Sequence, residues 1–220
     1  MNQDNAAPRL DQPPPQGLSV RVGGNMDVQT TGENGDYRSG RCVVDTPMPD
    51  GYPRPTPPGA LEIKSYPPVR MARVSASGNP DRGMNRAFWP LFRHIQRNEI
   101  PMTSPVEVSY EKLSPSKSSD PESWSMAFLY RTPAAHETGQ DGDVAVLDSK
   151  PVTVLAAGMK GNYSMSLVHK GMERIEAWLG EHPEWQPAGE WRTLYYNGPS
   201  LFFWDKWAEV QLPIKPARGE

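Results

Sequence analysis

Apolar and polar residues alternate over several short stretches from residue 61 onward, a spacing of two that is typical of half-buried strands. The clearest stretches are 61–66 and 69–74, which Pro67 and Pro68 separate, and 106–110 and 124–130, which flank a polar loop. Shorter apolar runs of the same kind lie at 144–147, 152–157, 194–196 and 207–212. The body of the chain is therefore predicted to be rich in strands.

Two other stretches repeat their apolar residues every three or four positions, which predicts amphipathic helices. The first begins at Met84 and has apolar residues at positions 84, 87, 88, 91, 92 and 95. Pro90 lies within it and is expected either to kink the helix or to mark the first turn of its regular part. The second helix is predicted at about 163–181, where His182-Pro183 ends it.

A strand, a Gly-containing turn and a helix thus occur twice, about 80 residues apart, and further strands follow each helix. This internal repeat predicts an α+β body with pseudo-twofold symmetry. Two antiparallel sheet halves would curl into an open barrel with one helix packed on each. A cleft between a helix and the sheet is then the expected site for a small ligand.

The composition changes near residue 58. The first 58 residues hold 10 of the 25 Pro and none of the 7 Trp. We expect residues 1–58 to form a Pro-rich arm that is partly disordered, and residues 59–216 to form one ligand-binding domain. Within the arm, residues 18–46 contain two short apolar runs that either add a hairpin to the domain or stay mobile, and residues 47–58 predict a stiff linker.

Charge and cysteine content narrow the function classes. The net charge of -3, without any run of Lys and Arg, argues against general nucleic-acid binding. No apolar stretch approaches the roughly 18 residues that a membrane span needs, and the first residues lack the features of a secretory signal. The single cysteine, Cys42, cannot form an internal disulfide, which favours a cytoplasmic protein. No Cys pair or His-x-x-x-His spacing offers a zinc site.

The residues after the first predicted helix, Asn98-Glu99-Ile100-Pro101-Met102-Thr103-Ser104-Pro105-Val106, form a distinctive segment. It resembles the SOUL haem-binding protein family, in which a helix ends in Asn-x-x-Ile-x-Met-Thr-x-Pro-Val. Three further parts agree in order: 61–66 is similar to the family's opening Tyr-Glu-Val-Arg-x-Tyr strand, 88–95 to its Phe-x-x-Leu-x-x-Tyr-Ile, and 207–210 to its closing strand. The resemblance covers about residues 59–214.

The resemblance implies a distorted antiparallel eight-stranded β-barrel flanked by two helices, with the duplication that the pattern also predicts. It implies a non-catalytic carrier or buffer of haem or another tetrapyrrole. In one branch of the family a His in the opening strand is the axial ligand of the iron. Ser65 holds that position here, and a serine hydroxyl is a poor iron ligand, so we expect this mode to be absent.

In another branch, haem lies against the first helix without a protein axial ligand. That mode predicts a binding face of apolar side chains, with arginines near the propionates. The candidate residues are Met84, Arg86, Phe88, Leu91, Phe92 and Arg93. His94 stands at an aromatic position of the family and is the candidate axial ligand. An ordinary amphipathic helix, with a buried apolar stripe, a solvated Arg93 and a hydrogen-bonded His94, is the competing interpretation.

Two alternative functions depend on Glu107 and Glu209, which both lie in apolar strand patterns. A carboxylate aimed into a barrel would have a raised pKa. It would serve as counter-charge for a cationic or amphipathic small molecule, as in the related gyrase-inhibitor-like pockets, or as the base of a small hydrolase. The hydrolase ranks last, because the sequence contains no convincing catalytic constellation. Outward-facing strand positions are the simpler interpretation of both residues.

Overall fold

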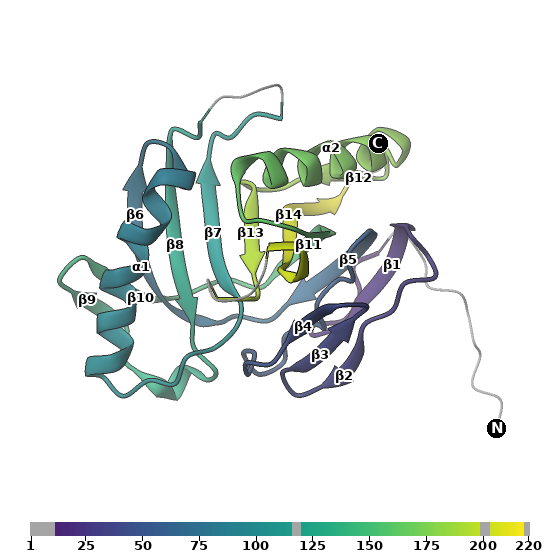
Figure 1. Ribbon diagram of the computed structural model, residues 1–220. Helices are drawn as coiled ribbons and strands as arrows, with labels where there is room; N and C mark the ends of the chain where they lie inside the picture. Colours follow the sequence, from purple (N-terminus) through teal and green to yellow (C-terminus); the bar gives the residue numbers. More distant parts are fainter. Residues whose placement is uncertain (1–11, 116–119, 199–202, 218–220) are drawn as a thin grey trace.

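The computed structural model (Figure 1) describes residues 12–115, 120–198 and 203–217. Most of its strands form one large antiparallel sheet in the order β1-β5-β11-β14-β13-β7-β8-β6-β10-β9, and β12 pairs with β14. In chain order these strands are β1 (Ser19–Gly24), β5 (Ala60–Tyr66), β6 (Arg70–Ser77), β7 (Val106–Glu111), β8 (Ser123–Leu129), β9 (Gly139–Asp141), β10 (Val144–Asp148), β11 (Val152–Lys160), β12 (Trp185–Pro187), β13 (Arg192–Tyr195) and β14 (Trp207–Pro216). A small sheet contains β2 (Thr31–Glu33), β3 (Asp36–Ser39) and β4 (Cys42–Val44).

The predicted α+β class is confirmed, because two helices accompany this large antiparallel sheet. The eight-stranded barrel is not confirmed. The sheet has 11 strands among the described residues, and β1 and β9, at the two ends of its pairing order, do not pair with each other. The three additional strands are β1 of the arm, which extends the sheet at β5, the short β9, which extends it at β10, and β12, which pairs with β14.

The predicted internal repeat is visible in the pairing of the strands. In the first unit, β6 is followed by α1 (Pro80–Arg97), β7 and β8, and the strands pair in the order β6-β8-β7. In the second unit, β11 is followed by α2 (Met165–Glu181), β13 and β14, and the order is β11-β14-β13. The two units meet where β7 and β13 pair antiparallel, at the centre of the sheet.

Both helices begin at residues suited to a helix start. Pro80 occupies the first turn of α1, where its missing N–H costs nothing, and the helix starts four residues before the apolar repeat does. Pro90 lies well inside α1, so it does not mark the first turn. At α2, Ser164 accepts a hydrogen bond from the Leu167 amide, and Asp81 of α1 accepts one from the Met165 amide (2.8 Å). The start of α1 is thereby joined to the start of α2.

The helices pack their apolar stripes on one face of the sheet, which we call the front face. Leu91 and Ile95 of α1 and Met172 and Ile175 of α2 belong to the same buried cluster, so both helices share one core. Gly171 lets α2 approach closely, because a Cβ at this position would meet Val210 of β14 at 2.4 Å. Neither helix of the described residues is long and apolar enough to cross a membrane.

Much of the described arm covers the opposite face, which we call the back face, while β1 lies at the sheet edge and contacts Trp178 of α2. Residues 18–46, for which the sequence left two alternatives, form β1 along the edge of β5 and the small sheet β2-β3-β4, which lies apart from both helices (Figure 1). Tyr37, Cys42 and Val44 pack with Tyr66 and Trp207 in a second buried cluster. Residues 1–11 of the arm, which was predicted to be partly disordered, lie outside the described residues.

Candidate functional site

The outer surface of α1 carries a stripe of exposed side chains. Arg86, Trp89 and Arg93 are spaced by three and four residues, so they lie on one side of the helix. Both arginines are exposed, and Trp89 has an exposed fraction of 56%. A large exposed aromatic residue between two cationic groups suits a flat, partly apolar ligand that carries acidic groups.

An aromatic cluster continues inward from Trp89. The rings of Phe88 and Phe92 stack at 5.6 Å between centroids, and the ring of Trp89 meets both edge-on at 5.9 Å. Phe88 also contacts Phe128 of β8 at 5.2 Å, edge-on, which fixes the cluster to the sheet. Phe88 and Phe92 are half-buried. The cluster therefore joins the front-face core to solvent.

The structure divides the sequence-predicted residues into two groups. Leu91 has an exposed fraction of 0% and belongs to the core, and Met84 is half-buried against it. Phe88 and Phe92 reach the surface beside the exposed Arg86 and Arg93. Trp89 was not among the predicted residues, because it lies outside the apolar stripe of the helix. The signal that was available is a large aromatic residue on the polar side of an amphipathic helix.

His94, the candidate axial ligand, is engaged through both ring nitrogens and has an exposed fraction of 1%. Its Nδ1 lies 2.6 Å from Asp141, whose carboxylate accepts a hydrogen bond, and its Nε2 lies 2.7 Å from the Tyr130 hydroxyl. The hydrogen bond from His94 holds the pKa of Asp141 below its ordinary value, and Arg97 acts in the same direction. Burial raises the pKa of Tyr130 to about 12. This cluster ties α1 to the β9-β10 hairpin.

Ser65, at the position of the family's axial His, is buried, and its hydroxyl lies 3.1 Å from that of Thr153 on β11. The arm passes beside it, because the Gly17 amide donates to the Ser65 carbonyl at 2.8 Å. Among the described residues, no group of three or more His, Cys, Asp or Glu is placed to hold a metal ion.

Glu107 and Glu209 both lie on the back face, away from the helices. Glu209 contacts Lys64 at 2.8 Å, and both side chains have an exposed fraction of 0%. Glu107 contacts Arg192 at 3.0 Å. Each carboxylate has its own cation, so neither is left as counter-charge for a cationic ligand or as a free base.

Glu209 is the centre of the back-face network. It accepts hydrogen bonds from Lys64, from the Tyr196 hydroxyl at 2.7 Å and from the Thr56 amide at 2.8 Å. Burial alone would raise the pKa of this carboxyl, but the charge of Lys64 and these hydrogen bonds outweigh burial and lower it. Lys64 also donates to the Arg54 carbonyl at 2.8 Å. Two backbone groups of the arm thereby complete the network.

The middle of the front face, between the two helices, is filled by tyrosines. The Tyr110 hydroxyl of β7 lies 2.9 Å from the Thr193 hydroxyl and 3.3 Å from the Tyr195 hydroxyl, both on β13. Burial raises the pKa of Tyr110 and of Tyr195, so both are neutral phenols at physiological pH. These three hydroxyl groups therefore satisfy one another in the middle of the front face.

The segment after α1, the aromatic face of the helix and the repeated strand order agree with one protein family. A family model described as "SOUL heme-binding protein" matches residues 54–213. The chain belongs to this SOUL family. A search of curated protein sequences finds no match to the chain.

Solved structures share the fold at low sequence identity. The C-terminal domain of EcmrR is 11% identical, with a TM-score of 0.59 over 71% of this chain and 98% of that chain. An uncharacterized conserved protein from Listeria innocua is 12% identical, with a TM-score of 0.53 over 70% of this chain and 92% of that chain. A hydrolase from Listeria innocua is 10% identical, with a TM-score of 0.51 over 70% and 91%. At such identities the likeness concerns the fold alone.

Proposed function

We propose that this SOUL-family protein binds haem, or another tetrapyrrole, on the outer aromatic face of α1 and acts as a carrier or buffer. The observation that carries the proposal is the exposed Trp89, beside Phe88 and Phe92 and between the exposed Arg86 and Arg93. The aromatic rings would contact the macrocycle, and the two guanidinium groups would pair with its propionates. Membership of the SOUL family supports haem as the first ligand to test.

The residues on α1 fit the organic part of a haem better than its iron. His94 is the single histidine of α1, and both of its ring nitrogens are engaged. Binding would therefore rest on apolar contact and on the propionates, which gives modest affinity and suits a protein that releases its ligand. A free, buried Cys42 agrees with a reducing compartment such as the cytoplasm, which we propose as the location.

A haemin titration followed by the Soret band tests this function. We expect a saturable one-to-one shift. A curve identical to that of an unrelated protein of similar aromatic content would contradict haem binding. Trp89→Ala removes the exposed ring and is expected to weaken binding about tenfold, a loss of about 1.4 kcal/mol. Arg93→Glu reverses one charge and should weaken binding to a similar extent.

Two matched variants control for general effects. Trp204→Ala removes another exposed tryptophan far from α1 in sequence, and Arg54→Glu reverses another exposed arginine. Both should bind haemin as the wild type does. If Trp204→Ala weakens haemin binding and Trp89→Ala does not, the proposed site on α1 is wrong, although haem binding itself would stand. His94→Ala should leave the Soret maximum unchanged, because the iron does not use this ring.

A further inference from the structure

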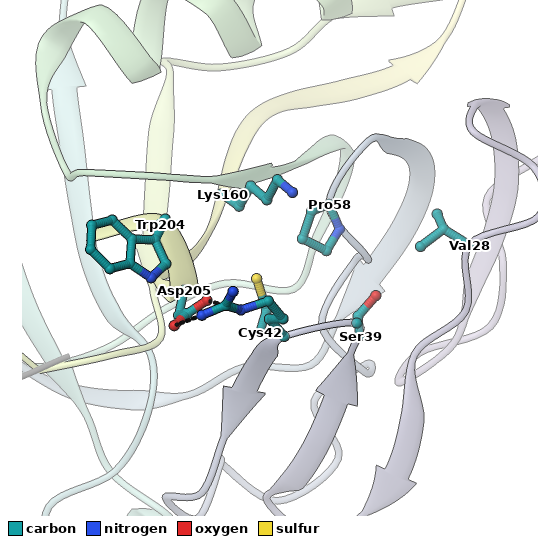
Figure 2. A pocket seen from close by; sticks show the side chains of 9 residues that line it. Val28, Ser39, Cys42, Pro58, Lys160, Trp204 and Asp205 are labelled. Atoms are coloured by element: carbon teal, nitrogen blue, oxygen red, sulfur yellow. Dashed lines mark hydrogen bonds and ion pairs between the residues drawn. The ribbon is translucent and has the colours of Figure 1, made fainter. Parts of the chain in front are cut away.

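A cleft of about 630 Å³ lies where the arm meets the body of the protein, and we call it the arm cleft (Figure 2). The arm contributes Val28, Ser39, Cys42 and Pro58 to its walls, and the body contributes Lys160, at the end of β11, and Trp204. Its volume lies within the range of small-molecule sites. It is separate from the aromatic face of α1, with which it shares no residue.

Part of the arm cleft is apolar. Trp204 has an exposed fraction of 46%, and Val28 and Pro58 lie on the opposite side of the opening (Figure 2). Cys42 forms part of the floor, and burial raises the pKa of its thiol, so the thiol stays protonated and neutral. A flat ring placed against Trp204 would cover these groups and gain contact area on both sides.

The charges in the arm cleft leave one cation in excess. Arg41 and Asp205 form an ion pair, with Nε 3.0 Å from Oδ1 and Nη2 donating to Oδ2 at 3.2 Å, and Oδ1 accepts no hydrogen bond from the described residues. Lys160 has no ion-pair partner among the described residues, and its ammonium group extends toward Pro58 across the opening (Figure 2). A ligand with one negative charge would complete this set.

Ser39 supplies an independent sign of a missing partner. Its exposed fraction is 6%, and its hydroxyl has no hydrogen-bond partner within the part of the chain that the structure describes. A buried hydroxyl without a partner is costly, so such groups are rare unless a ligand or water satisfies them. In Figure 2 this hydroxyl points from β3 toward the side of the cleft on which Val28 lies.

We propose that the arm cleft binds a small organic anion with a flat ring, an aromatic carboxylate being the simplest member of the class. Its ring lies against Trp204, its carboxylate pairs with Lys160, and the Ser39 hydroxyl donates a hydrogen bond to the same carboxylate. The arm is then part of a binding site as well as a cover for the back face. This site is independent of the proposed tetrapyrrole site on α1.

Calorimetric titration of the full-length protein with naphthoate tests the proposal. Naphthoate is expected to bind with a dissociation constant below about 1 mM. Naphthylmethylammonium, which has the same ring and the opposite charge, and acetate, which has the charge without the ring, should bind at least about tenfold more weakly. Equal binding of the two naphthyl compounds, or no naphthoate binding, would overturn the proposal.

Variants assign the binding to the arm cleft. Lys160→Met and Trp204→Ala should each weaken naphthoate binding about tenfold. Lys150→Met, at an exposed lysine before β11, and Trp89→Ala should leave it unchanged within about twofold. Ser39→Ala is a smaller change and should weaken naphthoate binding a few-fold. It tests the same site if Lys160→Met or Trp204→Ala fails to fold. Naphthoate binding that is insensitive to all three cleft variants, or that Trp89→Ala removes, would overturn the site.

The haemin titration keeps the two proposals distinguishable. Lys160→Met should bind haemin as the wild type does, and Trp89→Ala should bind naphthoate as the wild type does. Loss of haemin binding in Trp89→Ala alone supports the α1 site without bearing on the arm cleft. Loss of naphthoate binding in Lys160→Met and Trp204→Ala supports the arm cleft even where haemin does not bind at all.

Discussion

The two faces of the large sheet are both covered, but by different chemistry. On the front face, α1 and α2 bury aliphatic and aromatic side chains, and the polar groups in the middle of that face are neutral hydroxyls such as those of Tyr110 and Thr193. On the back face, the arm closes over the ion pairs Lys64–Glu209 and Arg192–Glu107. The helices cover the front face with apolar side chains. The Pro-rich arm covers the back face in part with backbone groups, which serve as hydrogen-bond partners of the buried charged side chains.

The two faces should therefore tolerate different substitutions. A buried ion pair contributes little net stability, but removing one partner leaves an uncompensated charge and is severely destabilising. The back face is therefore fixed in composition. The proposed binding residues of the front face, Trp89 and Arg93, lie outside the packed core. They are free to change with the ligand while the fold stays the same.

The largest expected effect is on the back face. Lys64→Met leaves the Glu209 carboxylate buried without its cation, and we expect the free energy of unfolding to fall by about 3–5 kcal/mol. Urea unfolding of the wild type and the variant measures this difference in free energy. The matched control is Lys112→Met, because Lys112 pairs with Glu122 in a fully exposed position and its loss should leave the unfolding midpoint unchanged. A Lys64→Met midpoint equal to that of the wild type would contradict the comparison.

Periodicity predicted much of the front face because burial on one side imposes a repeat on the sequence. The strand predicted at 106–110 is β7 and the helix predicted at about 163–181 is α2, with small differences at the ends. Periodicity assigns a residue to a face but does not name its partner. Lys64 and Glu209 lie 145 positions apart, and only the pairing of β5 and β14 with β11 brings them together.

The candidate site was predictable in part for the same reason. The helical repeat of apolar residues includes Phe88 and Phe92, but it also includes Leu91, which lies in the core, and it does not include Trp89. An apolar stripe contains both core and surface-reaching side chains, and periodicity alone does not separate the two kinds. The arm was harder still, because β1 has no partner until the edge of β5 exists.

The pH dependence of stability gives a second test of the back face. Because the folded-state pKa of Glu209 lies below its ordinary value of 4.5, the folded state favours the charged carboxylate. Its contribution is present above about pH 4.5 and is lost as the pH falls through the folded-state pKa. Glu209→Gln lacks this group, so its stability should fall less on acidification than that of the wild type. Unfolding free energies measured from about pH 7 to about pH 3 give the difference, and parallel curves would contradict the assignment.

A pair of glycines in α2 tests the close packing of the front face. Gly171→Ala places a methyl group against Val210, and overpacking of about 1–3 kcal/mol should exceed the gain of up to about 1 kcal/mol in helix propensity. The variant should melt at a lower temperature. Gly180→Ala in the same helix meets no atom within 4 Å, so it should gain about 0.5–1 kcal/mol. Shifts of the same sign in both variants would show that α2 does not depend on contact at Gly171.

The smallest expected change in stability is at the proposed binding surface. Arg93→Gln removes one exposed charge and no packing, so the free energy of unfolding should stay within about 0.5 kcal/mol of the wild type. If Arg93 pairs with a propionate, haemin affinity should nevertheless fall a few-fold, and added salt should weaken the wild type more than the variant, because the variant lacks the screened charge. Urea unfolding and Soret titrations at two salt concentrations separate the two quantities. A loss of stability as large as the loss of affinity would show that Arg93 contributes to the packing of the front face. The proposed difference, in which the back face is fixed in composition and the α1 surface is free to change, would then not hold at Arg93.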